Sequence, residues 1–246
     1  MASMIIADPL HTLLTVNHLF CFLFVLSASF GLATWDSVEA QQRVPWTTSH
    51  VEGTPEPAKP YHIARVYPKL TFSNPVELRP IPKTNQMLLL QVDGKLFVFD
   101  DDQECDEPQL ILDLGKDLEQ MRAYGFGLHP DFEANRQLFI VYSRDTRFVA
   151  DAARLSRFIV PHEAPYEIDR ASEEVLVTWN SGGHNGSTVQ FDDEGYLYFS
   201  AGDGARPFPP DEFNVGQDLS DLRATICRID VDHSDEGLEY RIPPDN

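Results

Sequence analysis

Residues 180–204 read NSGGHNGSTVQFDDEGYLYFSAGDG, and after a polar loop residues 217–232 read QDLSDLRATICRIDVD. Apolar and polar residues alternate on both sides of Asp-Glu-Gly at 193–195, a pattern typical of a β-hairpin. The second segment contains one more run of the same kind. The sequence therefore predicts three short strands, with His184 in a glycine-rich turn before them and Asp203 at a strand end.

From residue 67 onward, the rest of the chain also consists of short apolar runs separated by turns. Strands are predicted at 75–81, 86–92, 95–100, 108–114, 124–130, 136–143, 153–160 and 173–179, and a further strand is expected to begin at 238–243. Asp93-Gly94 is the expected turn between two of them. Residues 116–122 could form at most a turn or two of helix. The strands group into a four-stranded module repeated three times, with a period of roughly 50 to 60 residues.

Four-stranded antiparallel modules in series are typical of a β-propeller, so the predicted fold class is all-β with about three blades. A closed ring needs at least four blades, and a half-ring would leave sheet edges unpaired. We therefore expect the chain to be the first part of a longer protein. A self-contained β-sandwich built from the same strands is the alternative.

Composition limits the possible functions. The 246 residues are 42% hydrophobic, which is enough for a core, and carry a net charge of −20. Such a charge repels phosphate backbones, so a nucleic-acid partner is not expected. The spacing of the three cysteines matches no zinc knuckle. Cys21 lies in the leader, and the sequence leaves open whether Cys105 and Cys227 pair.

The N-terminus predicts export. An apolar run at 13–33 is followed by small residues that end at Ala40, which indicates a signal peptide over 1–40. No basic residue precedes the run, because Arg43 is the first in the chain. An uncleaved membrane anchor at 13–33 is the alternative, since a span needs about 20 apolar residues. Both alternatives place the remainder in an extracytoplasmic space, periplasmic or secreted.

Residues 41–65 are polar and proline-rich and are expected to form an unstructured lead-in, and residues 66–246 are expected to form the propeller domain. Within that domain, His129 is interpreted as part of a blade turn. The acidic stretches at 100–104 and 230–237 are interpreted as solvated turns, because neither has the spacing of a dedicated calcium loop.

Several short motifs follow one another in an order that resembles a known family. They are PKLTFSNPVEL at 68–78, DGKL at 93–96, GFGLHPDF at 125–132, HNGS at 184–187, FDDEGYLY at 191–198, GDG at 202–204, QDL at 217–219, RIDVD at 228–232 and IPPDN at 242–246. Over residues 66–246 the chain resembles the glucose/sorbosone dehydrogenase family. The resemblance implies the N-terminal half of a six-bladed propeller that uses pyrroloquinoline quinone (PQQ) and calcium. It also implies a sugar substrate and an electron acceptor, with most cofactor contacts beyond residue 246.

The same resemblance assigns roles to three residues. His184 is implied as the base that takes the hydroxyl proton of the sugar as hydride leaves, a task that suits histidine near neutral pH. Asp203 is implied to face the substrate or to orient His184, and Gln120 is a weaker match to a cofactor contact. No metal ligand is assigned. The alternative for His184 is a turn histidine, and for Asp203 a turn aspartate that binds its own backbone.

The chain also departs from the family pattern. Gly183 stands where relatives have an acidic residue, Ser187 replaces a glycine, and residues 119–125 are one residue longer than usual. A non-catalytic propeller that binds carbohydrate or protein at the cell surface is therefore the second hypothesis. A third is a fragment that is inactive because it lacks half of its site.

Overall fold

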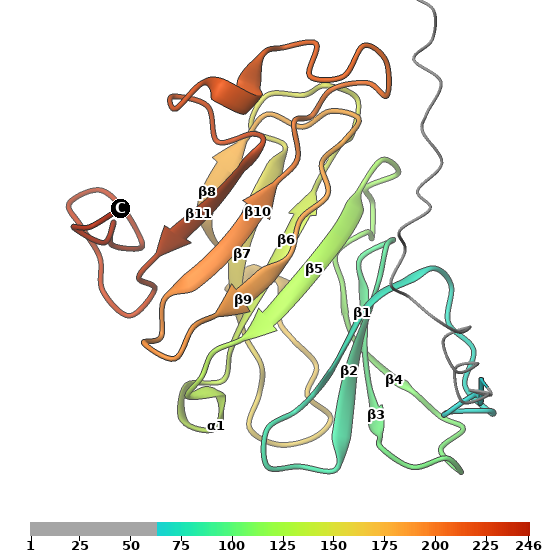
Figure 1. Cartoon of the computed structure of the whole chain (residues 1–246). Coiled ribbons are helices and arrows are strands. Elements are labelled where there is room, and N and C mark those ends of the chain that lie inside the picture. The colour runs from blue at the N-terminus through green and yellow to red at the C-terminus, as the bar shows by residue number, and fades with distance from the viewer. Residues whose placement is uncertain (1–62) are drawn as a thin grey trace, which may run out of the picture. The chain divides into compact units, whose positions relative to one another are not determined.

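Three antiparallel sheets make up residues 63–246, the part of the chain that the computed structural model describes (Figure 1). The first contains β1 (Pro75–Pro80), β2 (Gln86–Gln91), β3 (Lys95–Asp100) and β4 (Gln109–Asp113). The second contains β5 (Arg122–Leu128), β6 (Gln137–Ser143), β7 (Ala153–Ile159) and β8 (Glu174–Trp179). The third contains β9 (Val189–Phe191), β10 (Leu197–Ala201) and β11 (Thr225–Ile229). Short helices are α1 (Phe132–Asn135), η1 (Arg170–Ser172) and η2 (Val215–Gln217).

Each sheet is a meander in which consecutive strands pair, as the hairpin pattern predicts. The predicted turn at Asp93-Gly94 joins β2 to β3, and Gly94 has a φ of +83° that favours glycine. The turn between β9 and β10 is held by Asp192, whose carboxylate accepts hydrogen bonds from the backbone N–H groups of Glu194 and Tyr196, each 2.9 Å long. The strand predictions in the first two modules are therefore confirmed.

The three sheets pack face to face in series. One face of the second sheet buries Leu138 and Ile140 against the first sheet, in a core that includes Leu88 and Phe126. Its other face buries Phe139 against the third sheet, in a core with Phe199 and Ile229. Because the second sheet is covered on both faces, the β-sandwich alternative is wrong, since a sandwich has one interior between two sheets.

The third module differs from the prediction in its fourth strand. Only an isolated bridge between Asp230 and Arg241 forms where a strand was expected at 238–243. Pro243 ends the expected strand and Pro244 follows it, and proline has no N–H to continue a ladder. The outer edge of β11 therefore has no neighbouring strand within residues 63–246. An apolar groove of about 430 Å³ lies along it, lined in part by Ile226.

The structure decides two further points, one of which the sequence left open. Residues 116–120 form turns and no helix, because Asp117 adopts a left-handed φ of +68° that interrupts a helical path, and Arg122 already belongs to β5. Cys105 and Cys227 are both free thiols.

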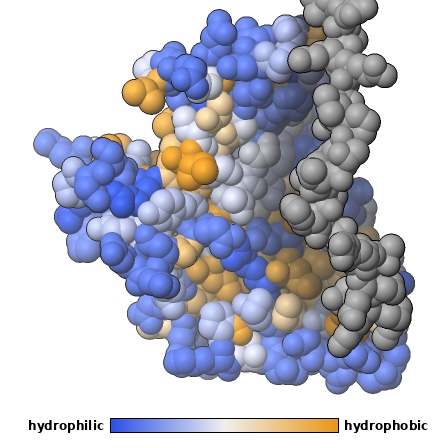
Figure 2. Space-filling model, viewed as in Figure 1, coloured by the Kyte–Doolittle hydropathy of each residue, from blue (hydrophilic) through white to orange (hydrophobic). Residues whose placement is uncertain are grey.

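The predicted leader at 1–40 and nearly all of the lead-in at 41–65 lie outside the described residues. Within residues 63–246 no helix is long and apolar enough to cross a membrane. Figure 2 shows a surface that is mainly hydrophilic at both ends of the visible face, with hydrophobic residues gathered between them.

Replacing Phe139 by alanine should lower the free energy of unfolding by about 3 to 5 kcal/mol, because it removes a fully buried ring from the core between the second and third sheets. Urea unfolding followed by circular dichroism measures this. Ile226 is 77% exposed, so Ile226→Ala is the control and should change the value by less than about 0.5 kcal/mol. Equal effects would contradict the face-to-face packing.

Candidate active site

The glycine-rich turn before β9 is bound along its backbone to the segment that follows β10. The N–H of Gly183 donates to the carbonyl of Gly204 at 3.0 Å, and the N–H of His184 donates to the carbonyl of Ala205 at 3.0 Å. The N–H of Gly204 donates back to the carbonyl of His184 at 2.9 Å. A Cβ on Gly182 would lie 1.8 Å from the Gly204 carbonyl oxygen, so only glycine allows this approach.

This backbone contact brings His184 and Asp203 together. The Nδ1 atom of His184 lies 3.3 Å from Oδ1 of Asp203, and their side chains are 49% and 20% exposed. The same Oδ1 accepts a hydrogen bond from the backbone N–H of Ala205 at 2.9 Å. Asp203 therefore has the backbone-binding geometry of a turn aspartate and also faces the imidazole.

The arrangement has a definite chemical consequence. A carboxylate beside Nδ1 favours the tautomer with hydrogen on Nδ1, which leaves the lone pair on Nε2. A half-exposed imidazole in that tautomer can accept a proton from a bound molecule through Nε2.

Arg223 adds a cation near this acidic turn. Its Cδ atom lies 3.2 Å from the place that a Cβ on Gly204 would occupy. A hydrogen bond to Asp221 raises the pKa of Arg223, and the charges of Asp211 and Asp203 act in the same direction. Arg223 was not predicted as a site residue, because its sequence neighbours give no sign that the loop after β10 folds back toward Gly204.

Asn185 and Tyr124 are two further residues that sequence reasoning missed. The Asn185 side chain is almost fully buried, and its Nδ2 donates to the hydroxyl of Tyr124 at 3.1 Å. Tyr124 lies on β5 in the second sheet, far from Asn185 in the sequence. Only the packing of the second and third sheets shows that the two residues meet.

Gln120 is not brought to this pair. It lies in the turn directly before β5, and within residues 63–246 no hydrogen bond joins it to His184 or Asp203. Its role as a cofactor contact stays a prediction. No cluster of three or more His, Cys, Asp or Glu side chains that could hold a metal ion occurs in the described part of the chain.

His129 belongs to a structural turn, as interpreted from the sequence. Its ring is buried, and its Nδ1 accepts a hydrogen bond from the backbone N–H of Asp131 at 3.0 Å. The amide of Asn135 contacts the same nitrogen at 2.7 Å. Nε2 lies 3.2 Å from Oδ1 of Asp232 but is not aligned for a hydrogen bond.

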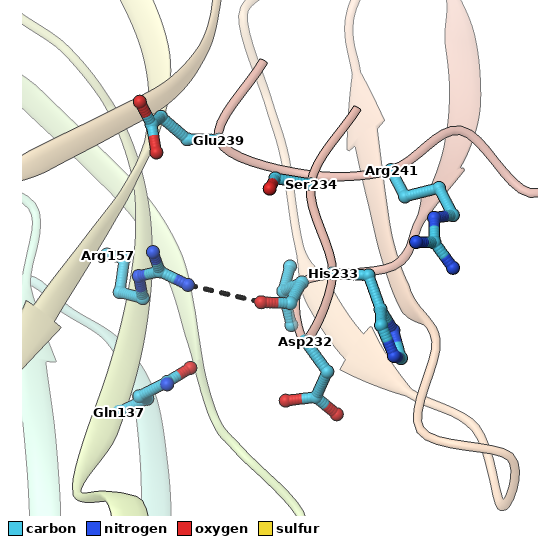
Figure 3. Close-up of a pocket in the computed structure, with 8 residues that line it drawn as sticks. Gln137, Arg157, Asp232, His233, Ser234, Glu239 and Arg241 are labelled. Atoms are coloured by element: carbon cyan, nitrogen blue, oxygen red, sulfur yellow. Dashed lines mark hydrogen bonds between the residues drawn. The ribbon is translucent and has the colours of Figure 1, made fainter. Parts of the chain in front are cut away.

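A polar cavity of about 500 Å³ lies beside this turn (Figure 3). Asp203 follows β10 and Asp232 follows the antiparallel β11, so the cavity and His184 are at opposite ends of the sheet. Arg157 donates to the carbonyl of Val231 at 3.1 Å in the cavity and forms an ion pair with Glu174. Its charge is thus already neutralised within the protein, and we assign the cavity no function.

The chain matches the family model described as Glucose / Sorbosone dehydrogenase over residues 72–238, more than half of its length. The chain belongs to the glucose/sorbosone dehydrogenase family. The match contains β1 to β11 and both His184 and Asp203.

Solved structures of sugar dehydrogenases share the fold. The PQQ-bound form of an aldose sugar dehydrogenase from Streptomyces coelicolor has a TM-score of 0.53 and 16% identity, covering 68% of this chain and 47% of that one. A glucose dehydrogenase has a TM-score of 0.52 and 19% identity, covering 70% of this chain and 50% of that one. The likeness confirms the predicted fold class, an all-β propeller of which this chain supplies about three blades.

Two curated relatives are described as Hedgehog-interacting protein and not as dehydrogenases. Hedgehog-interacting protein from Mus musculus is 24% identical over 173 residues, which are 68% of this chain and 24% of that protein. The Homo sapiens protein is 26% identical over 125 residues, 48% of this chain and 18% of that protein. This family member thus spans about half the length of the solved structures and a quarter or less of these curated relatives.

Gly182→Ala should displace the turn that carries His184 and lower the free energy of unfolding by about 1 to 3 kcal/mol, because the new methyl would overlap the Gly204 carbonyl. Hydrogen exchange of the His184 amide should become faster. Gly186→Ala is the control, since a Cβ there meets nothing within 4 Å and should be neutral or stabilise by up to about 1 kcal/mol. Unchanged exchange in Gly182→Ala would contradict the close approach.

Proposed function

We propose that this chain belongs to an exported quinoprotein-type dehydrogenase that oxidises a sugar or aldose, with His184 as the proton acceptor. The observation that carries the proposal is the pairing of His184 with Asp203 at 3.3 Å at the strand ends of a glucose/sorbosone dehydrogenase domain. The apolar run at 13–33 supports an extracytoplasmic location, either secreted, periplasmic or anchored at the membrane. The partners are then a small sugar and an electron acceptor.

The chain's own residues would act on the proton. Asp203 lies beside Nδ1 and favours the tautomer with hydrogen there, so Nε2 of His184 would take the proton of the sugar hydroxyl as the C–H bond breaks. The carboxylate of Asp203 stabilises the imidazolium that forms. PQQ, when bound with calcium, supplies the hydride acceptor. The half-exposed imidazole fits the proton-accepting role, and Gln120 is the one residue of this chain that the family resemblance assigns to the cofactor.

A non-catalytic propeller that binds carbohydrate or protein at the cell surface is the second candidate. It is favoured by the similarity to Hedgehog-interacting protein and by Gly183, one of the departures of the sequence from the family pattern. In that case His184 and Asp203 would be turn residues only.

Reconstitution of the full-length gene product with PQQ and calcium tests the enzyme. The protein should reduce an artificial dye acceptor with members of an aldose panel, and His184→Ala should lower kcat by about 100-fold or more because the proton acceptor is lost. His129→Asn serves as the control, since His129 lies in the structural turn beside Asp131. Absence of dye reduction, or activity that His184→Ala leaves intact, would overturn the proposal.

Titration with PQQ separates the two candidates. An enzyme should bind the quinone with a saturable change in its absorbance, whereas a pure binding module should leave the spectrum unchanged. Saturable sugar binding without quinone binding would support the second candidate.

A further inference from the structure

The pairing of β5 with β6 contains one extra residue at Tyr124. Ala123 lies opposite Tyr142, and Gly125 lies opposite the next residue, Val141. Two steps along β5 thus meet one step along β6, which is the geometry of a β-bulge. A bulge changes the direction of the side chain that it carries, and bulges are frequent beside active sites. The bulge falls inside residues 119–125, the segment that is one residue longer than the family pattern.

The bulged Tyr124 reaches out of its own sheet. Its half-buried hydroxyl accepts a hydrogen bond from Nδ2 of Asn185 at 3.1 Å. Burial raises the pKa of Tyr124, so the phenol stays protonated at neutral pH and remains a neutral partner for the amide. The contact joins the second sheet directly to the turn before β9.

The Asn185 side chain also forms hydrogen bonds with the backbone of the turn. Its Oδ1 accepts from the N–H of Gly182 at 2.7 Å, and its Nδ2 donates to the carbonyl of Gly182 at 2.7 Å. The side chain is 3% exposed, so a lost partner would leave a buried polar group unsatisfied. His184 lies inside the loop that this amide closes, between Gly182 and Asn185.

We propose that Tyr124 and Asn185 are positioning residues that fix the direction of the His184 ring toward Asp203. This inference rests on the proposed role of His184 as proton acceptor. Two restraints define the turn: the backbone bonds to Gly204 and Ala205 on one side, and the Asn185 amide on the other. The N–H and the carbonyl of Gly182 set the orientation of that amide, and the Tyr124 hydroxyl, which accepts from Nδ2, ties the amide to the second sheet.

Tyr124→Phe tests the inference in the full-length gene product reconstituted with PQQ and calcium. We expect kcat to fall by about 10-fold to 100-fold with little change in KM, because the base is displaced while substrate contacts remain. The ratio of the two His184 ring tautomers, read from imidazole ¹⁵N shifts and assigned with His184→Gln, should shift toward hydrogen on Nε2.

Tyr142→Phe is the matched control. Tyr142 is a buried tyrosine on the neighbouring β6, and its hydroxyl donates to the Glu173 carboxylate without touching Asn185. It should lower thermal stability about as much as Tyr124→Phe does while leaving kcat and the His184 tautomer ratio unchanged.

The outcomes separate this inference from the proposed function. If the wild-type protein shows no turnover but Tyr124→Phe still shifts the His184 tautomer ratio, the positioning role holds and the dehydrogenase proposal fails. If the tautomer ratio is the same in wild type and Tyr124→Phe, or moves equally in Tyr142→Phe, the positioning role is wrong.

Discussion

The burial of both faces of the second sheet is the constraint on which the rest of the structure depends. Alternate residues of β6 enter two different cores, with Ile140 facing the first sheet and Phe139 facing the third. A strand with period-two alternation normally buries one face only, so apolar residues at nearly every position of β6 require two covering sheets. This serial packing sets the distance and angle between β5 and the turn before β9.

Within this packing, two glycines allow the close approach that forms the candidate site. Gly182 and Gly183 let two backbone segments approach so closely that a methyl group on either would overlap a carbonyl oxygen. The approach places His184 beside Asp203 and leaves the imidazole half exposed. A larger residue at either glycine would therefore push the two segments, and with them His184 and Asp203, apart.

The hydrogen bond between Tyr124 and Asn185 connects the packing of the sheets to the turn that carries His184. The hydrogen bond crosses from one blade to the next, so the orientation of the turn depends on how the second and third sheets pack. In the polar cavity near His129, at the opposite end of the sheet, Arg157 also bonds across the two blades, but it is already paired with Glu174. The bulge in β5 lies in the segment 119–125, which is longer than the family pattern, and its Tyr124 contacts Asn185.

The sequence by itself determined the strands of the first two modules, the hairpin turns and the candidates His184 and Asp203, because alternation and glycine are local signals. It was wrong about a fourth strand at 238–243, where Pro243 ends the local pattern. Only the tertiary structure decided that three sheets pack in series and that Tyr124 meets Asn185. These contacts join residues far apart in the chain, and no periodicity along the sequence encodes them.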